Sequence, residues 1–320
     1  MSNCSDQVQL DFFISFPHRL HCVVSILVAV MTCMVSYKAV KMLLYRNVFS
    51  DSTRALLLMS VGCSVAQEVA HGAIRTSDLY RSIVYSDDPC RIMAEGQHCF
   101  IPTLVFFFNI DAFFYLASLL SIQRCFTKRT SDSMHFARVG AFLIVFASVC
   151  TVWWTFEHED TNEPKWSCTM PSGPTIKRVA TISVVFIILC IVDFIMCFIG
   201  LLVNYCQLQR CKRTYQMSQI YDAHESYITT KTVFVISSSQ LFLILITVFF
   251  SNYARTRTLD YYTKSTILMW SYLFNYAALI LPTSTMLMSK WVICQRNQRI
   301  RHVKKETVDD QWKQINDAWS

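Results

Sequence analysis

Three acidic residues, Glu68, Asp111 and Asp193, lie inside long apolar stretches of this sequence. A charged side chain at the centre of a bilayer costs roughly 2.5–3.5 kcal/mol, so an acid in such a stretch usually serves binding or proton chemistry. Asp111 follows Cys99 by 12 residues, about 18 Å along a helix. Glu68 is expected in the outer half of its stretch, whereas Asp193 is expected about 22 Å deep. We therefore rank Glu68 and Asp111 above Asp193 as contacts for a ligand.

Few basic groups can neutralise these acids. No lysine or arginine is expected at the same depth, and His71, three residues from Glu68 on the same helix face, is the only candidate cation. Glu68 and His71 are thus predicted to form a polar subsite. Otherwise the acids are expected to be protonated, to face water, or to be hydrogen-bonded to polar neighbours, namely Asn109, Gln67 and the serines at 237–239.

No arrangement of residues predicts catalysis. The chain contains no G-x-G-x-x-G, P-loop, G-x-S-x-G or H-E-x-x-H motif, and its cysteines form no pair at zinc spacing. The densest cluster of possible metal ligands is Glu157-His158-Glu159-Asp160, which we interpret as a solvated acidic loop. We expect no enzymatic activity, no metal and no cofactor.

The composition indicates a membrane protein. Of the 320 residues, 53% are hydrophobic and only 16% are charged, against about 25% charged in soluble domains. Seven stretches are long and apolar enough to cross a bilayer. They predict an all-α membrane protein, a seven-transmembrane helix bundle with spans at about 20–44, 55–74, 100–123, 138–156, 178–205, 229–251 and 265–288.

The basic residues predict the orientation of the spans. Of the 29 lysines and arginines, 19 fall in the connections on one side and 10 in those on the other, and the richer side is expected to be cytoplasmic. The net charge of +7 therefore points to a lipid bilayer and not to nucleic acid. Residues 1–19 become an extracellular N-terminus, 20–288 the bundle and 289–320 a cytoplasmic tail. Residues 1–17 lack the apolar core of a signal peptide, so the first span is expected to act as signal anchor.

The expected topology sorts the sites of modification. Asn3 begins the sequon Asn3-Cys4-Ser5 and is a glycosylation candidate in the extracellular N-terminus. Four cysteines fall outside and allow three pairings. We favour Cys99 with Cys168, which leaves Cys4 with Cys90, although one or both pairs can remain reduced. Cys294, in a basic stretch after the last span, is a candidate for palmitoylation, with a plain stop-transfer tail as the alternative.

The third apolar stretch ends at Gln123-Arg124-Cys125, and further basic residues follow on the cytoplasmic side. They form either an ordinary membrane-edge anchor, as the positive-inside rule alone requires, or the switch face of a receptor. The basic residues expected to surround this cytoplasmic cavity are Arg124, Lys128, Arg129, Arg210, Lys212 and Arg213.

Seven spans, an outside N-terminus and cysteines at the top of span 3 and in the next extracellular loop together resemble a G-protein-coupled receptor. Cys99 and Arg124 are 25 residues apart, about 37 Å of helix, which matches the distance in that family from its cysteine to the arginine of its Asp/Glu-Arg-Tyr motif. Gln123 and Cys125 depart from the motif, and Pro282 lacks the Asn-Pro-x-x-Tyr context. Without an acid at 123, Asp132 and Glu225 are the candidates to restrain Arg124.

Three local stretches resemble the nematode serpentine chemoreceptors of the Sra type: "NCSD", "YSDDPCRIMAEGQHCF" and "YDAHESYITTK". The last is similar to that group's Tyr-Gln…Glu-Asn…Thr-Thr pattern, from which Asp222 and Ser226 depart. The resemblance implies a chemosensory receptor in the plasma membrane of sensory neurons, in the cilium. It would bind an extracellular small-molecule ligand and couple to a heterotrimeric G protein, by a shift between inactive and active packings.

Two other functions remain open. A transporter or channel commonly shows internal repeats and spans interrupted by glycine or proline, whereas the halves of this chain look unrelated and glycine is scarce. A non-signalling membrane adaptor would keep its partner after loss of Arg124 and the cytoplasmic loops.

Overall fold

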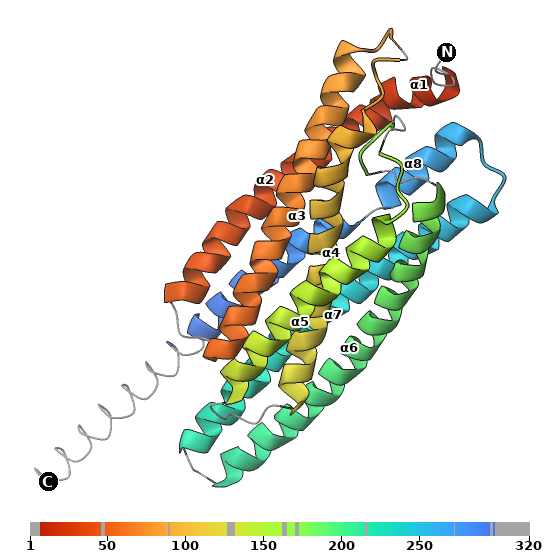
Figure 1. The fold of residues 1–320 in the computed structure, drawn as a ribbon. Coiled ribbons are helices and arrows are strands. Elements are labelled where there is room, and N and C mark those ends of the chain that lie inside the picture. Colours follow the sequence, from red (N-terminus) through yellow and green to blue (C-terminus); the bar gives the residue numbers. More distant parts are fainter. Residues whose placement is uncertain are drawn as a thin grey trace, which may run out of the picture.

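The computed structural model describes residues 7–45, 49–88, 90–126, 132–161, 165–169, 173–214, 217–271, 273–294 and 297, and most of these residues are helical (Figure 1). The labelled helices are α1 (Gln7–Ile14), α2 (Phe16–Tyr45), α3 (Asp51–Val84), α4 (Gly96–Phe126), α5 (Asp132–Phe156), α6 (Gly173–Thr214), α7 (Met217–Thr256) and α8 (Tyr261–Ser271). Residues 274–294 are also helical and continue from α8.

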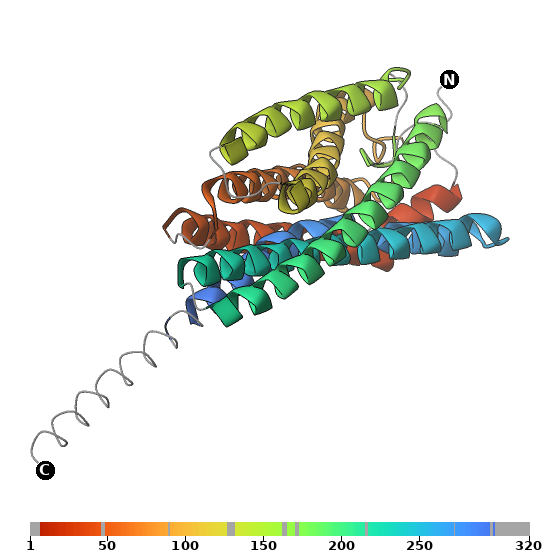
Figure 2. The same ribbon diagram turned by 90° about the horizontal axis from the view of Figure 1, so that it is seen from below.

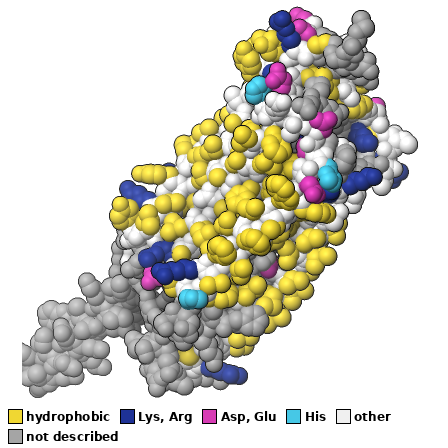
Figure 3. Space-filling model, in the orientation of Figure 1, with side chains coloured by type: hydrophobic (Ala, Val, Ile, Leu, Met, Phe, Trp, Pro, Cys, Tyr) yellow, Lys and Arg dark blue, Asp and Glu magenta, His cyan; other side chains and the backbone are white. Residues whose placement is uncertain are grey.

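Seven of the described helices are long and apolar enough to cross a membrane, which confirms the predicted seven-helix architecture. They are Phe16–Tyr45, Asp51–Val84, Gly96–Gln123, Met134–Phe156, Thr175–Cys211, Ser226–Ala254 and Tyr261–Cys294. Apolar side chains cover the middle of the molecule, and charged side chains gather toward its two ends (Figure 3). This distribution is the one that a lipid-facing bundle requires, because hydrocarbon cannot solvate charge.

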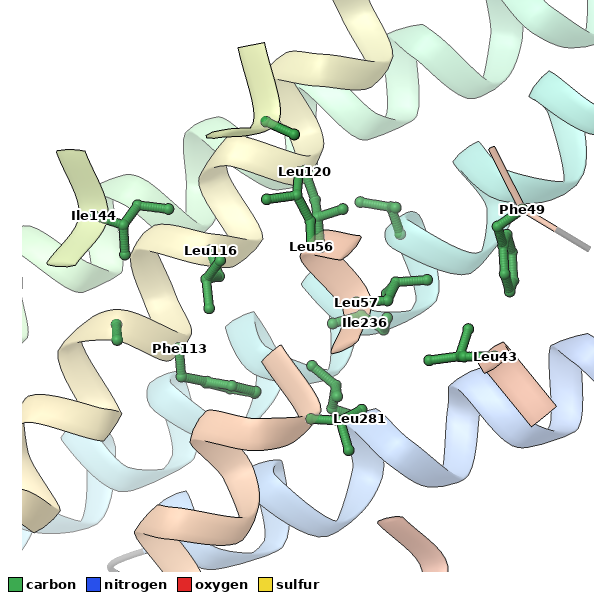
Figure 4. Packing of buried hydrophobic residues seen from close by; sticks show 14 of the residues in the cluster. Leu43, Phe49, Leu56, Leu57, Phe113, Leu116, Leu120, Ile144, Ile236 and Leu281 are labelled. Atoms are coloured by element: carbon green, nitrogen blue, oxygen red, sulfur yellow. The ribbon is translucent and has the colours of Figure 1, made fainter. Parts of the chain in front are cut away.

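Several buried polar side chains within the helices form hydrogen bonds with the backbone of their own helix. Thr32 and Ser60 each donate a hydrogen bond to the carbonyl four residues earlier, at 2.8 and 2.9 Å. Such bonds satisfy a hydroxyl without any partner helix. A large apolar cluster then joins α2, α3, α4, α7 and the helix at 274–294 (Figure 4), with Leu57, Leu116, Ile236 and Leu281 among its buried members.

The two ends of the bundle differ, and we name them by their residues. The disulfide end carries the Cys99–Cys168 bond and the starts of α2, α4, α6 and α8, and the Gln123 end lies opposite. At the disulfide end the short helix α1 packs through Phe12 and Phe13 against Tyr261 and Trp166. Residues 1–19 carry no pattern that predicts this helix and are expected only to form an extracellular segment.

A buried carboxylate organises the disulfide end. Asp78 accepts hydrogen bonds from Arg75 (3.2 Å), Arg81 (2.6 Å) and the Ser167 hydroxyl (2.6 Å), and its side chain is fully buried. Arg81 also donates to the Ile92 carbonyl at 2.8 Å. Helix α3 continues past residue 74, where the second span is predicted to end, as far as Val84, and both arginines are buried within it.

We predict that Asp78→Asn destabilises the protein by about 3 kcal/mol, because it leaves two buried guanidinium groups without a counter-charge. In lipid nanodiscs this should lower the unfolding temperature by roughly 5–10 °C. Asp87→Asn removes the same charge from an exposed position and is the control. Equal melting of the two variants would show that the Asp78 ion pairs contribute no stability.

Candidate ligand-binding site

Asp111 lies on α4 against a cavity between α4, α5, α6 and the start of the helix at 274–294. The cavity volume is about 40 Å³, within about 410 Å³ of empty space that includes the open surroundings. Asp111 itself is only 3% exposed and makes no hydrogen bond or ion pair with another described residue. A buried acid that faces a cavity without a protein partner is available to a ligand.

The walls of this cavity are mainly apolar. Phe107 and Ile110 come from α4, Ile182 and Phe186 from α6, and Phe274 closes the fourth side. Aromatic packing fixes these walls, since Phe114 stacks on Phe186 at 4.5 Å and meets Phe274 edge-on at 5.8 Å between ring centroids. Two hydroxyls, Thr155 and Ser183, complete the lining, although each already donates to its own helix.

The connection after α5 is tied to α6 at the disulfide end. Glu159 is buried there, paired with Lys165, and accepts a hydrogen bond from the Thr175 hydroxyl of α6. The prediction of a solvated acidic loop at 157–160 is therefore wrong for Glu159, whose side chain is 1% exposed, whereas Glu157 and His158 do reach solvent. Lys165 also pairs through its backbone with Ala94, so the two loops are joined.

A second hollow lies beside α3 and α4 at the same end and encloses about 820 Å³, including open space. Its charged rim residues, Glu95 and His98, are largely exposed and contact each other at 3.1 Å. Since this hollow holds no buried group without a partner except Arg81 Nε, we place the candidate site in the cavity against Asp111.

Glu68 and His71 do not pair as predicted. His71 Nε2 lies within hydrogen-bond distance of Arg75 Nε (3.1 Å) and of Asn275 Nδ2 (3.2 Å). Glu68 is fully buried, and neither of its carboxyl oxygens has a hydrogen-bond partner among the described residues. The prediction failed because Arg75, which was assigned to a loop, lies one helical turn after His71 and donates a hydrogen bond to its ring nitrogen.

The other polar residues of the spans are bound in different ways from those expected. Asn109 donates to the carbonyl of Val105 on its own helix at 2.7 Å. Asp193 accepts from the Ser118 hydroxyl of α4 at 2.7 Å, which joins α4 to α6. Gln67 donates to the carbonyl of Phe274 at 3.3 Å. None of these three lines the cavity.

A disulfide joins Cys99 to Cys168, the pairing favoured from the sequence. Cys90 also forms a disulfide, and its expected partner, Cys4, lies outside the described residues, as does Asn3. Next to the first bond, the Thr103 hydroxyl contacts the carbonyls of both Cys99 and Cys168. The segment at 165–169 is thereby held against the start of α4.

At the Gln123 end, Gln123 is buried and donates to the Ser52 hydroxyl of α3 at 2.7 Å. Asn204 of α6 donates to Thr230 of α7 at 2.9 Å, and Lys231 lies 4.8 Å from the centre of the Trp291 ring. Arg210 and the free thiol of Cys294 are exposed. The remaining predicted residues of this face have side chains outside the described part of the chain: Arg124, Cys125, Lys128, Arg129, Asp132, Lys212, Arg213 and Glu225.

Comparison with known proteins identifies a family and several relatives of similar length. A family model described as serpentine type 7TM GPCR chemoreceptor Sra matches residues 1–319. Serpentine receptor class alpha-28 of Caenorhabditis elegans is 23% identical over 314 residues, which cover 93% of this chain and 90% of the relative. Serpentine receptor class alpha-10 of the same species is 24% identical over 336 residues, which cover 100% of this chain and 98% of the relative.

We predict that Glu68→Gln leaves the unfolding temperature within about 2 °C of the parent protein, because a fully buried carboxyl group without a partner is expected to be neutral, and glutamine has nearly its shape. Thermal unfolding in nanodiscs at neutral pH measures this, with Asp78→Asn as a paired acid for comparison. A decrease as large as that of Asp78→Asn would mean that Glu68 is charged and compensated.

Proposed function

Because this chain belongs to the Sra-type serpentine seven-transmembrane GPCR chemoreceptors, we propose that it detects an extracellular small-molecule cue and signals through a heterotrimeric G protein. The observation that carries the proposal is the buried acid against a mainly apolar cavity in a receptor of this family. We propose Asp111 as the polar anchor of the ligand. Glu68, His71 and Asn109 do not line the cavity, so their influence on binding would be indirect.

In this proposal the disulfide end faces outward and the Gln123 end faces the cytoplasm, in the plasma membrane of a sensory neuron and its cilium. The excess of lysine and arginine in the connections at the Gln123 end supports this orientation. The disulfide-bonded cysteines at 90, 99 and 168 support it independently, because such bonds persist in oxidising compartments. Asn3 would then be available for glycosylation and Cys294 for palmitoylation.

The cytoplasmic face would bind the G protein through basic residues and change its packing when ligand binds. Arg210 is exposed as such a role requires, and Arg124, Lys128, Arg129, Lys212 and Arg213 remain proposed members of that surface. In place of an ion pair next to Arg124, a neutral hydrogen bond from Gln123 to Ser52 joins α4 to α3. Ligand binding would act by favouring the packing in which these contacts are rearranged.

We predict that Asp111→Asn reduces the potency of an active cue about tenfold or more, since a charge-assisted contact contributes about 1.5–3 kcal/mol. A heterologous signalling screen against volatile and water-soluble cues would identify the cue and measure its potency. Asp193→Asn, at a second buried acid away from the cavity, is the matched control. If the cue has equal potency on both variants at equal surface level, Asp111 does not belong to the ligand site. A response that survives Arg124→Ala would contradict the proposed switch role of Arg124.

We also predict that Ser52→Ala raises signalling without ligand by about threefold, because one interhelical hydrogen bond contributes about 0.5–1.5 kcal/mol to the inactive packing. The measurement is basal G-protein activation, normalised to receptor at the cell surface. Ser60→Ala removes a hydroxyl that bonds only to its own helix and should change nothing. Unchanged basal activity in both variants would show that the Gln123–Ser52 contact does not restrain the receptor.

A further inference from the structure

The possible entrances to the cavity against Asp111 differ in how tightly they are closed. Toward the disulfide end, one turn before the lining residue Val179, Thr175 of α6 donates to Glu159, which pairs with Lys165 in the segment held by the Cys99–Cys168 bond. A water-soluble molecule arriving from that end would have to separate a buried ion pair, which is costly. The disulfide end is therefore an unfavourable entrance.

The side between α5 and α6 is closed far less tightly. The two helices lie close together at the disulfide end and diverge away from it (Figure 2). Of the cavity lining, Thr155 comes from α5, while Val179 and Ser183 come from α6 and are partly exposed. On the adjoining turns of α5 and α6, Trp153 is 72% exposed and Val184 is 56% exposed, as lipid-facing side chains are. The bilayer thus reaches the edge of the cavity.

One contact closes this edge. The Arg178 side chain donates to the carbonyl of Trp154, lies 5.3 Å from the centre of the Trp154 ring, and reaches Glu157 at 3.5 Å. Arg178 and Trp154 are each one residue from the lining, since Thr155 follows Trp154 and Val179 follows Arg178. We call the Arg178–Trp154 contact the clasp. Opening the clasp breaks the cation–π contact, the hydrogen bond to the Trp154 carbonyl and the approach to Glu157, but because both side chains are partly exposed, polar surroundings can replace these contacts.

We propose that the ligand is an amphiphile that partitions into the bilayer, with an apolar body and one basic group, and that it reaches Asp111 from the lipid between α5 and α6 past the clasp. This inference rests on the proposed function, since it concerns the same cavity. The apolar body matches the aromatic and aliphatic walls, and the basic group offsets the charge of the one acid in the lining. Concentration in the membrane would raise the local supply of such a molecule.

The route can be tested without a known cue. In Ser183→Cys receptor reconstituted in nanodiscs, the labelling rate at position 183 is measured by mass spectrometry with N-ethylmaleimide, which enters lipid, and with a sulfonated maleimide, which does not. We expect the first reagent to react at least about tenfold faster. Arg178→Gln should raise that rate about fivefold. Lys177→Gln, an exposed neighbour of equal charge whose side chain makes no contact with another described residue, should leave it unchanged.

The ligand class is tested in the same protein. Octylamine should slow the labelling of position 183, and this protection should be lost in Asp111→Asn, whereas octanol should protect less in either background. Equal rates for the two maleimides, or equal effects of Arg178→Gln and Lys177→Gln, would overturn the lipid route. If octanol protects as strongly as octylamine, the proposal that the ligand carries a basic group is wrong. The labelling rates do not depend on signalling. The proposed receptor function is tested separately by the signalling screen, so failure of one proposal can be distinguished from failure of the other.

Discussion

The disulfide end of the bundle depends on the carboxylate of Asp78. Two buried arginines and one serine hydroxyl converge on it, and without it both guanidinium groups would be buried without a counter-charge. Through Ser167 it holds the segment at 165–169, which Cys168 ties to α4, and through Arg81 it reaches Ile92 and the Phe13 ring of α1. One side chain thus joins α3, both loops and the N-terminal helix.

This constraint divides the molecule into a firm part and a looser part. The helices α2, α3 and α4 share an apolar cluster, Arg19 of α2 donates to Ser82 of α3, and Gln123 of α4 donates to Ser52 of α3. At the edge of the cavity, α5 and α6 are joined by the partly exposed clasp and by Thr175 with Glu159. A ligand that enters the cavity would therefore displace α5 and α6 before it disturbed α3 or α4.

Span number and helical character were predictable because they depend on composition along single segments, and the chain shows seven long apolar helices. Contacts between segments were not. Arg75 and Arg81 looked like loop residues since charges normally end a span, but Asp78 compensates them inside α3. Hydropathy therefore placed the end of this span ten residues before the end of α3 and misassigned the partner of His71. Helix α1 was missed for the same reason: its stability comes from packing against Trp166 and Tyr261, which are distant in sequence.

The same reasoning separates the two buried acids that the sequence ranked equally. Depth alone could not distinguish Glu68 from Asp111, because both are buried and neither has a hydrogen-bond or ion-pair partner among the described residues. The difference is what lies beside each of them. Asp111 borders an empty cavity that a ligand can fill, whereas Glu68 does not line it. Without a partner each buried acid is expected to be neutral, but Asp111 borders space in which a cation that arrives from outside the protein can stabilise its charged form. Binding energy is thus concentrated where the helices are least tightly joined, which is where a change in packing can begin.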